Sequence, residues 1–243
     1  MNTPRMRALV TGGSGELGAA ICRRLAAAGH FVYIHAHSHG ELAEDLASQL
    51  NSAGLHAAAV SFDVVNEMDT HRCLDALLEA GTIQIVVNNA GIHDDAVFPG
   101  MSSRQWHSVM NVSVDGFFNV TQRLMMPMIR SRWGRIVSVS SVSAQIGNRG
   151  QVNYSAAKGA LIAATRSLAA EVASRGITVN AVAPGIIATA LTQQTFDADK
   201  IARLVPMQRA GRPDEVASLV GFLCSDEAAY ITGQNIAING GII

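Results

Sequence analysis

Tyr154 and Lys158 are the residues whose types and spacing most directly suggest chemistry. They stand four positions apart in an alanine-rich segment, so a helix there would carry both side chains on one face, about one turn apart. A free phenol titrates near pH ~10, and an ammonium group within a few ångströms stabilises the phenolate and lowers that pKa. The pair therefore predicts a group that exchanges protons near neutral pH.

Several serines precede this pair at the end of an apolar run. Residues 135–140 read RIVSVS, and Ser141 follows them directly. Open α/β sheets bind ligands at the carboxyl ends of their strands, so hydroxyl groups at this point could touch a substrate. Taken one at a time, Ser138, Ser140 and Ser143 are more simply hydroxyls of a strand or a turn.

Residues 11–18 read TGGSGELG and separate the first apolar run from the first helix-length segment. Gly13, Gly15 and Gly18 match G-x-G-x-x-G, whose glycines permit a tight turn, close approach of the backbone to a pyrophosphate, and close helix–sheet packing. The N–H groups at the helix start then face the anion, which predicts a dinucleotide site. Glu16 suits the helix dipole but would repel a phosphate, so we expect its side chain to point to solvent.

The end of the second apolar run bears on which dinucleotide binds. NAD sites usually place an Asp or Glu there to hold the ribose 2′-hydroxyl. Here residues 34–39 read IHAHSH, and no acid appears before Glu41. A 2′-phosphate would meet no repulsion, and His37, Ser38 or His39 could donate a hydrogen bond to it. We therefore expect NADP(H), with NAD(H) as the alternative.

The histidines of this stretch also invite a metal hypothesis. His35, His37 and His39 alternate, so strand geometry would place them on one face. Histidines at the ends of strands are more often solvated, and the sequence offers no evident fourth ligand. We expect no metal.

Apolar runs alternate with helix-length segments along the chain, as the positioning of these residues requires. The expected strands cover 8–10, 31–34, 56–62, 83–88, 135–140, 178–183 and 235–238. The expected helices cover 17–28, 41–53, 68–80, a long segment from about residue 103, 154–174 and 213–223. Strands separated by helical crossovers form a parallel sheet covered on both faces. The fold class is therefore α/β: one domain over 1–243 with a single doubly wound, Rossmann-type sheet of seven strands.

Composition narrows the class of protein. The chain has 243 residues, 49% hydrophobic and 15% charged, which suffices for a large core and disfavours disorder. Its net charge of -1 leaves no basic surplus for nucleic acid. The three cysteines are scattered, and neither a secretory leader nor an uncharged apolar run of about 18 residues is evident. We expect a cytoplasmic protein that binds neither nucleic acid nor membrane.

With these motifs in place, the sequence resembles the short-chain dehydrogenase/reductase family over its whole length, from Thr11 to the closing NGGII. Residues 88–91 match the family's NNAG, which supports the sheet beside the cofactor, and 63–64 match its adenine-contacting pair. Residues 184–189 match its nicotinamide loop. The glycine-rich turn, the second strand end and this resemblance together give the expected cofactor contacts: Thr11, Gly12, Gly13, Ser14, Gly15, Leu17, Gly18, His37, Ser38, Asp63, Val64, Asn89, Ala90, Gly91, Tyr154, Lys158, Pro184, Gly185, Ile187 and Thr189.

The resemblance also implies a catalytic set of Asn111, Ser141, Tyr154 and Lys158. Ser141 rather than Ser140 matches the family's serine, thirteen residues before the tyrosine. In the implied mechanism a nicotinamide delivers a hydride to a carbonyl carbon, Ser141 hydrogen-bonds the carbonyl oxygen, and Tyr154 donates a proton. Lys158 would lower the tyrosine pKa and hold the nicotinamide ribose, and Asn111 would anchor a water that relays protons.

One feature departs from the family. Members of this length usually read T-G-x-x-x-G-x-G, which would place glycine where this chain has Glu16. The spacing here is typical of the longer members that include sugar epimerases, although the chain lacks their additional substrate domain. The contacts to the pyrophosphate are therefore expected to differ from the usual ones.

Within the family the sequence is most similar to bacterial 3-oxoacyl-[acyl-carrier-protein] reductases, through residues 147–154 and 171–184. This implies an NADPH-dependent reductase of β-ketoacyl chains on acyl carrier protein, serving fatty-acid synthesis or, as a paralogue, a polyene or polyketide pathway. Two arginines of that subfamily dock the acidic carrier beside the mouth of the active site, and they correspond to Arg132 and Arg175. The simpler interpretation of each is a solvated arginine at a helix end.

Other functions stay open. One alternative is a short-chain dehydrogenase acting on a free alcohol, sugar or other small carbonyl compound. Another is a catalytically silent nucleotide-binding subunit, against which the complete set of four residues argues. The family commonly forms homotetramers, and the alanine-rich helix would allow close helix packing. We also expect a substrate lid at about 187–212.

Overall fold

A computed structural model of the chain describes residues 6–190, 192 and 196–243. One sheet of seven parallel strands runs through the molecule, in the order β3-β2-β1-β4-β5-β6-β7. The strands are β1 (Arg7–Val10), β2 (Phe31–Ala36), β3 (His56–Ser61), β4 (Ile85–Asn88), β5 (Gly134–Val139), β6 (Ile177–Pro184) and β7 (Asn235–Ile238). This confirms the expected fold class, with strand ends shifted by only a few residues.

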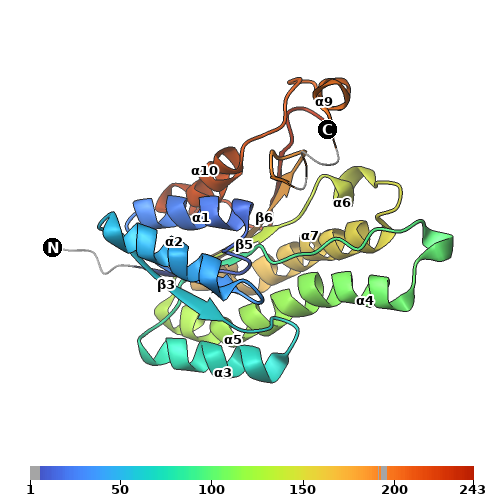
Figure 1. Ribbon diagram of the computed structural model, residues 1–243. Coiled ribbons are helices and arrows are strands. Elements are labelled where there is room, and N and C mark those ends of the chain that lie inside the picture. The colour runs from blue at the N-terminus through green and yellow to red at the C-terminus, as the bar shows by residue number, and fades with distance from the viewer. Residues whose placement is uncertain (1–5, 191, 193–195) are drawn as a thin grey trace.

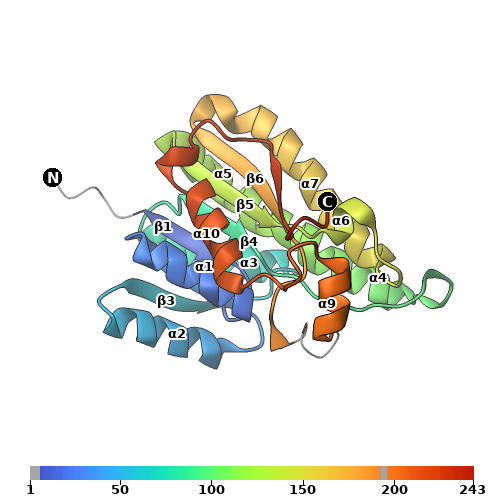
Figure 2. The ribbon, with the colours of Figure 1, turned by 90° about the horizontal axis from the view of Figure 1, so that it is seen from above.

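Helices cover both faces of the sheet (Figures 1 and 2). One face carries α1 (Glu16–Ala27), α2 (Gly40–Ser52) and α10 (Pro213–Leu223); the other carries α3 (Glu67–Glu79), α5 (Gly116–Ser131) and α7 (Val152–Val172). Neighbouring strand residues point to opposite faces, so Val10 joins the core under α1 and α10 while Leu9 joins the core under α3 and α5. Because both faces are buried, most residues of the strands are apolar.

The strand order reverses beside β1, whose neighbours are β2 and β4. The connections that leave the carboxyl ends of β1 and β4 go to opposite faces of the sheet. A doubly wound sheet opens a crevice for ligands at this point. The glycine-rich turn follows β1, and the NNAG segment follows β4.

The long helix expected from residue 103 is divided. Ser102 and Gln105 form a capping box that starts α4 (Ser103–Met110), and the next five residues, 111–115, form one wide π turn before α5. The carbonyl of Asn111 accepts the N–H of Gly116 across this turn. Such bulges in helices often mark functional sites, and this one begins at a residue of the expected catalytic set.

The two ends of the expected lid pair with each other just beyond β6. The Gly211 N–H donates to the Ile186 carbonyl at 2.9 Å, and the Ala188 N–H donates to the Gly211 carbonyl at 2.8 Å. Between these ends lies the short helix α9 (Ala198–Leu204), capped by the Asp197 side chain, at the top of Figure 1. This helix was not expected, nor was α6 (Ser143–Ile146). Residue 191 and residues 193–195 of the lid lie outside the described residues.

Within the described part of the chain, no helix combines the length and the apolar character needed to cross a lipid bilayer.

Candidate active site

Two glycines shape the turn after β1. Gly12 has a φ of +61°, and a Cβ placed on Gly18 would lie 2.1 Å from the Gly12 carbonyl oxygen. Any side chain at Gly18 would therefore push the helix away from the turn. A Cβ on Gly15 would come no closer than 3.6 Å to its nearest neighbour, so Gly15 is not required by space. The tight geometry rests on Gly12 and Gly18 rather than on Gly15.

The NNAG segment supports this turn from the side. The Asn89 side-chain amide donates to the carbonyls of Thr11 and Gly12, each at 3.0 Å. In return the Thr11 hydroxyl accepts the N–H groups of Asn89 and Ala90, each at 3.0 Å. Four hydrogen bonds thus fix the glycine-rich turn at residues 11–18, which we call the phosphate turn, to the end of β4.

The buried His35 side chain hydrogen-bonds to the backbone of this turn. Its Nδ1 accepts the Gly12 N–H at 3.1 Å, so the ring hydrogen is on Nε2, which lies 2.9 Å from the Phe62 carbonyl. The ring is buried, and this burial lowers its pKa to about 4. The prediction of a solvated histidine was wrong for His35. His37 and His39 lie beyond the end of β2 and are exposed.

A cavity of about 410 Å³ runs from the phosphate turn to Tyr154 and Lys158. Ten of the expected cofactor contacts line it: Gly12, Gly15, Leu17, Gly18, Asn89, Ala90, Gly91, Tyr154, Lys158 and Thr189. Four further lining residues were not among the expected cofactor contacts: Glu16, His93, Val139 and Ser140. A glycine cradle that a Cβ would fill, leading to a buried lysine, fits a nicotinamide dinucleotide. We call this space the cofactor cavity.

The other expected contacts lie outside the lining of the cofactor cavity: Thr11, Gly13, Ser14, His37, Ser38, Asp63, Val64, Pro184, Gly185 and Ile187. Asp63 accepts the Val65 N–H at 3.0 Å, and the buried Val64 packs against Gly116. His37 and Ser38 are exposed, and their side chains lie 3.4 Å apart.

Glu16 does not simply point to solvent, as the sequence had led us to expect. Its two carboxylate oxygens accept the N–H of Ala190 at 2.9 and 3.2 Å. Glu16 and Thr189 both line the cofactor cavity. The exposed side chain therefore joins the start of the phosphate helix to the start of the lid.

Tyr154 and Lys158 share one face of α7, as their spacing predicts. The Lys158 ammonium lies 5.7 Å from the centre of the Tyr154 ring and donates to the Val139 carbonyl at 2.8 Å. Burial alone lowers the pKa of Lys158 to about 8. Burial raises the pKa of Tyr154, hydrogen bonding with Ser141 opposes that rise, and the charge of Asp95 adds to it.

The structure separates the two candidate serines. Ser140 is buried and donates to the Lys158 carbonyl at 2.9 Å, so its hydroxyl serves to join β5 to α7. Ser141 lines the same cavity as Tyr154, and its hydroxyl accepts the Ser143 N–H at 3.1 Å. Asn111, at the π turn, is partly buried and lines neither cavity.

A second cavity of about 380 Å³, which we call the substrate cavity, adjoins Tyr154. Its lining comes from the segment after β4, the stretch from the end of β5 through α6 to the start of α7, the segment after β6 with the expected lid, and the C-terminal end of the chain. The apolar part is formed by Val142, Ile146, Ile186, Ile187, Phe196, Leu204 and Ile242. Gly185 and Ile187, expected at the cofactor, line this cavity instead. His93 and Tyr154 line both cavities.

A polar cluster that the sequence did not suggest surrounds the Tyr154 ring. His93 stacks on it with ring centres 4.1 Å apart and planes inclined by 23°. The Gln151 side chain donates to Asp95 at 2.8 Å and lies 3.4 Å from His93 Nδ1. The one available signal was position, since His93 and Asp95 closely follow the NNAG segment.

The chain is similar in sequence to known proteins along nearly its whole length. A family model described as enoyl-(acyl carrier protein) reductase matches residues 14–243. The 3-oxoacyl-[acyl-carrier-protein] reductase FabG of Aggregatibacter actinomycetemcomitans is 46% identical over 236 residues, covering 96% of this chain and 98% of that protein. FabG of Aquifex aeolicus (strain VF5) is 44% identical over 238 residues, covering 96% of each. The acetoacetyl-CoA reductase of Allochromatium vinosum is 41% identical over 239 residues, covering 97% of each.

The chain belongs to the short-chain dehydrogenase/reductase family. This short-chain dehydrogenase/reductase is an oxidoreductase, and membership implies a nicotinamide cofactor. The family resemblance seen in the sequence is confirmed.

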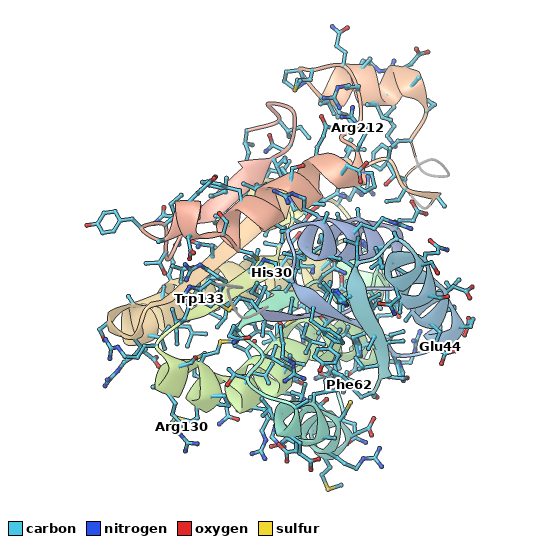
Figure 3. The ribbon with its side chains drawn as sticks, turned by 90° about the vertical axis from the view of Figure 1, so that its left-hand side faces the viewer. His30, Glu44, Phe62, Arg130, Trp133 and Arg212 are labelled. Atoms are coloured by element: carbon cyan, nitrogen blue, oxygen red, sulfur yellow. The ribbon has the colours of Figure 1, made fainter. Side chains whose placement is uncertain are left out.

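In this short-chain dehydrogenase/reductase, Arg132 and Arg175 lie close together. Arg132 follows α5 in a left-handed conformation, with φ 53°, and donates to the Ser174 carbonyl at 3.0 Å. Both arginines precede their strands, β5 and β6, so they lie at the amino-terminal edge of the sheet. Figure 3 looks onto this edge, where Trp133 and His30 precede β5 and β2. The two cavities lie at the opposite edge, so within one chain these arginines are not beside the mouth of the site.

Proposed function

We propose that this protein reduces the keto group of a 3-oxoacyl chain carried on acyl carrier protein to the 3-hydroxyacyl product, using NADPH. The observation that carries the proposal is the position of Tyr154 where the cofactor and substrate cavities meet, with Ser141 on the lining of the substrate cavity beside it. The names of the 3-oxoacyl-[acyl-carrier-protein] reductases supply the substrate class.

The residues of the chain divide the work around a substrate carbonyl. A reduced nicotinamide, when bound, supplies the hydride to the carbonyl carbon. Tyr154 donates its phenolic proton to the carbonyl oxygen, and the Ser141 hydroxyl hydrogen-bonds that same oxygen. Because burial raises the pKa of Tyr154, the phenol holds its proton at neutral pH until the oxygen becomes basic. This suits the reductive direction.

Lys158 and Asn111 support the proton transfer by Tyr154. The Lys158 ammonium is fixed by the Val139 carbonyl on the cofactor side of the Tyr154 ring, where it would hold the nicotinamide ribose and balance charge as the phenol loses its proton. Asn111, at the π turn, would hold a water that returns the proton from solvent.

The preference for NADPH rests on the end of β2. His37 and Ser38 are exposed there and can donate to a 2′-phosphate, and no carboxylate of β2 or its following turn opposes it. His37→Asp would place a negative charge at this point, so we expect kcat/KM for NADPH to fall at least about tenfold relative to NADH.

The carrier protein is expected to meet Arg132 and Arg175 on a second copy of the chain. In one chain these arginines lie on the edge away from the cavities, so a homotetramer would have to bring a neighbour's pair to the mouth. The double variant Arg132→Glu/Arg175→Glu should lose activity toward carrier-bound substrate and keep activity toward a small thioester. Light scattering checks the tetramer.

One activity panel tests the proposal. The purified protein is assayed with NADPH and with NADH against five substrates: a 3-oxoacyl carrier protein with an aliphatic chain, one with an aryl-polyene chain, acetoacetyl-CoA, a 2-enoyl carrier protein and a free ketone. We expect the highest kcat/KM with a 3-oxoacyl carrier protein and NADPH. Preference for the enoyl substrate, for the free ketone or for NADH would overturn the corresponding part of the proposal.

A further inference from the structure

Hydride and proton can reach one carbonyl group only where the cofactor and substrate cavities meet. Two residues, His93 and Tyr154, line both cavities. Tyr154 is accounted for as the proton donor, but the mechanism above gives His93 no part. Its ring lies flat on the Tyr154 ring, with 41% of its side chain exposed. A polar ring that borders both cavities is placed to contact the substrate that Tyr154 protonates.

The hydrogen bonds around Gln151 fix the tautomer of His93. The Gln151 Oε1 accepts from Ser143 at 3.2 Å and from Asn148 at 2.9 Å, which assigns the other end of the amide as Nε2. That nitrogen can only donate, and it lies 2.8 Å from Asp95 and 3.4 Å from His93 Nδ1. Nδ1 of His93 therefore accepts, and the hydrogen of the neutral ring is on Nε2.

The ring stays neutral for two reasons. Burial and the nearby Lys158 ammonium lower the pKa of His93, against the opposing influence of Asp95. Because Nδ1 is engaged and none of the residues that the structure describes accepts from Nε2, the Nε2–H of this neutral imidazole is the donor that borders the substrate cavity. Such a group donates one hydrogen bond to a neutral oxygen without offering a proton.

A 3-oxoacyl thioester presents two carbonyl oxygens, separated by a single methylene carbon. When Tyr154 and Ser141 engage the keto oxygen, the thioester oxygen lies only a few ångströms away, within reach of the His93 ring that stacks on Tyr154 and borders both cavities. We propose that His93 is a specificity-determining residue whose Nε2–H donates to the thioester carbonyl of the substrate, which selects 3-oxoacyl thioesters over simple ketones. This assignment rests on the proposed function and adds to it how the second carbonyl is recognised.

His93→Phe and His93→Gln separate recognition from packing. Phenylalanine keeps a flat ring for stacking on Tyr154 and removes the donor, whereas glutamine keeps an N–H and removes the ring. His107→Phe, which changes an exposed histidine on α4, is the matched control. Each variant is assayed with an acetoacetyl thioester of N-acetylcysteamine. The comparison substrate is the thioether ketone in which the thioester carbonyl is replaced by a methylene.

We expect His93→Phe to lower kcat/KM for the thioester about five- to tenfold, and to change kcat/KM for the thioether ketone less than about twofold. His93→Gln should restore most of the loss, and His107→Phe should match the wild type. An equal loss on both substrates, or no rescue by glutamine, would make His93 a packing residue and overturn the assignment. Wild-type protein inactive on a 3-oxoacyl carrier protein with NADPH would instead overturn the proposed function, which is a different result.

Discussion

The Glu16 carboxylate accepts the backbone N–H of Ala190 at 2.9 Å, although the two residues are 174 positions apart in the chain. One partner starts the helix that follows the phosphate turn, and the other starts the lid. A negative side chain thus lies on the lining of the cofactor cavity, where a pyrophosphate is expected. We therefore expect Glu16 to repel the cofactor while its carboxylate holds the segment after β6 in place.

Glu16→Gln tests whether the charge of Glu16 opposes cofactor binding, because glutamine keeps an acceptor oxygen for Ala190 and removes the charge. We expect the Kd for NADPH to fall about two- to fivefold at low salt, with a smaller difference at high salt. Titration of the nicotinamide fluorescence gives both values. Glu41→Gln, at the exposed start of α2, serves as the control. A Kd that rises or stays constant in Glu16→Gln would show that the charge does not oppose the cofactor.

His35 should make the fold sensitive to acid. Its pKa in the folded chain is about 4, below the ~6.5 of a free histidine, so the unfolded chain takes up this proton first as the pH falls. The stability that neutral His35 contributes is complete above pH ~6.5 and is lost as the pH falls through about 4, amounting to about 3 kcal/mol. Urea unfolding across this range, compared between wild type and His35→Gln, measures the contribution.

The same comparison has a control in His107→Gln, which changes an exposed histidine and leaves the contact between His35 and Gly12 in place. The control should follow the wild-type pH dependence. If His35→Gln follows it as well, the neutral ring of His35 does not stabilise the turn.

Lys158 should have its effect at alkaline pH. Its folded pKa of about 8 lies below the ~10.5 of a free lysine, so between these values the unfolded chain binds a proton that the folded chain has released. The free energy of unfolding of the wild type, relative to Lys158→Met, should rise by about 3 kcal/mol from pH ~8 to pH ~10.5. Denaturant titrations without cofactor measure it. A constant difference would mean that the ammonium is not destabilised by burial.

Tyr154 should ionise late in the cofactor-free protein. Burial is the largest cause of its raised pKa. The Lys158 ammonium lies over the ring, 5.7 Å from its centre. The chain has three tyrosines, so the phenolate absorbance of wild type minus that of Tyr154→Phe isolates one group. Its midpoint should lie above pH ~10. A midpoint below that value would restore the expected lowering by Lys158.

The fold could be predicted from the sequence because each strand must be apolar on both faces and each helix on one. Runs such as 8–10 and 31–34 carry that pattern without help from the rest of the chain. The π turn at Asn111 and the helix α9 could not be predicted in this way. The former is a local rearrangement inside a helical pattern, and the latter is a short polar segment whose position depends on the lid.

The candidate site was predictable where chemistry follows from spacing along one element, as for Tyr154 and Lys158 on α7. Contacts between distant elements were not. Spacing cannot show that Gly18 approaches the Gly12 carbonyl, that His35 is buried beneath the turn, or that Glu16 reaches Ala190. His93 could not be predicted as a site residue, because its position depends on the stacking with Tyr154, which lies 61 positions later in the chain.

The most direct test of the central claim is the mass and structure of the product formed on the carrier. Wild-type protein is incubated with a 3-oxoacyl carrier protein and NADPH, beside Tyr154→Phe, whose retained cofactor affinity is checked by fluorescence. We predict that the wild type adds the mass of two hydrogen atoms and yields the 3-hydroxyacyl chain, and that Tyr154→Phe is slower by about a hundredfold or more. An unchanged acyl mass, or equal rates for the two proteins, would contradict the account.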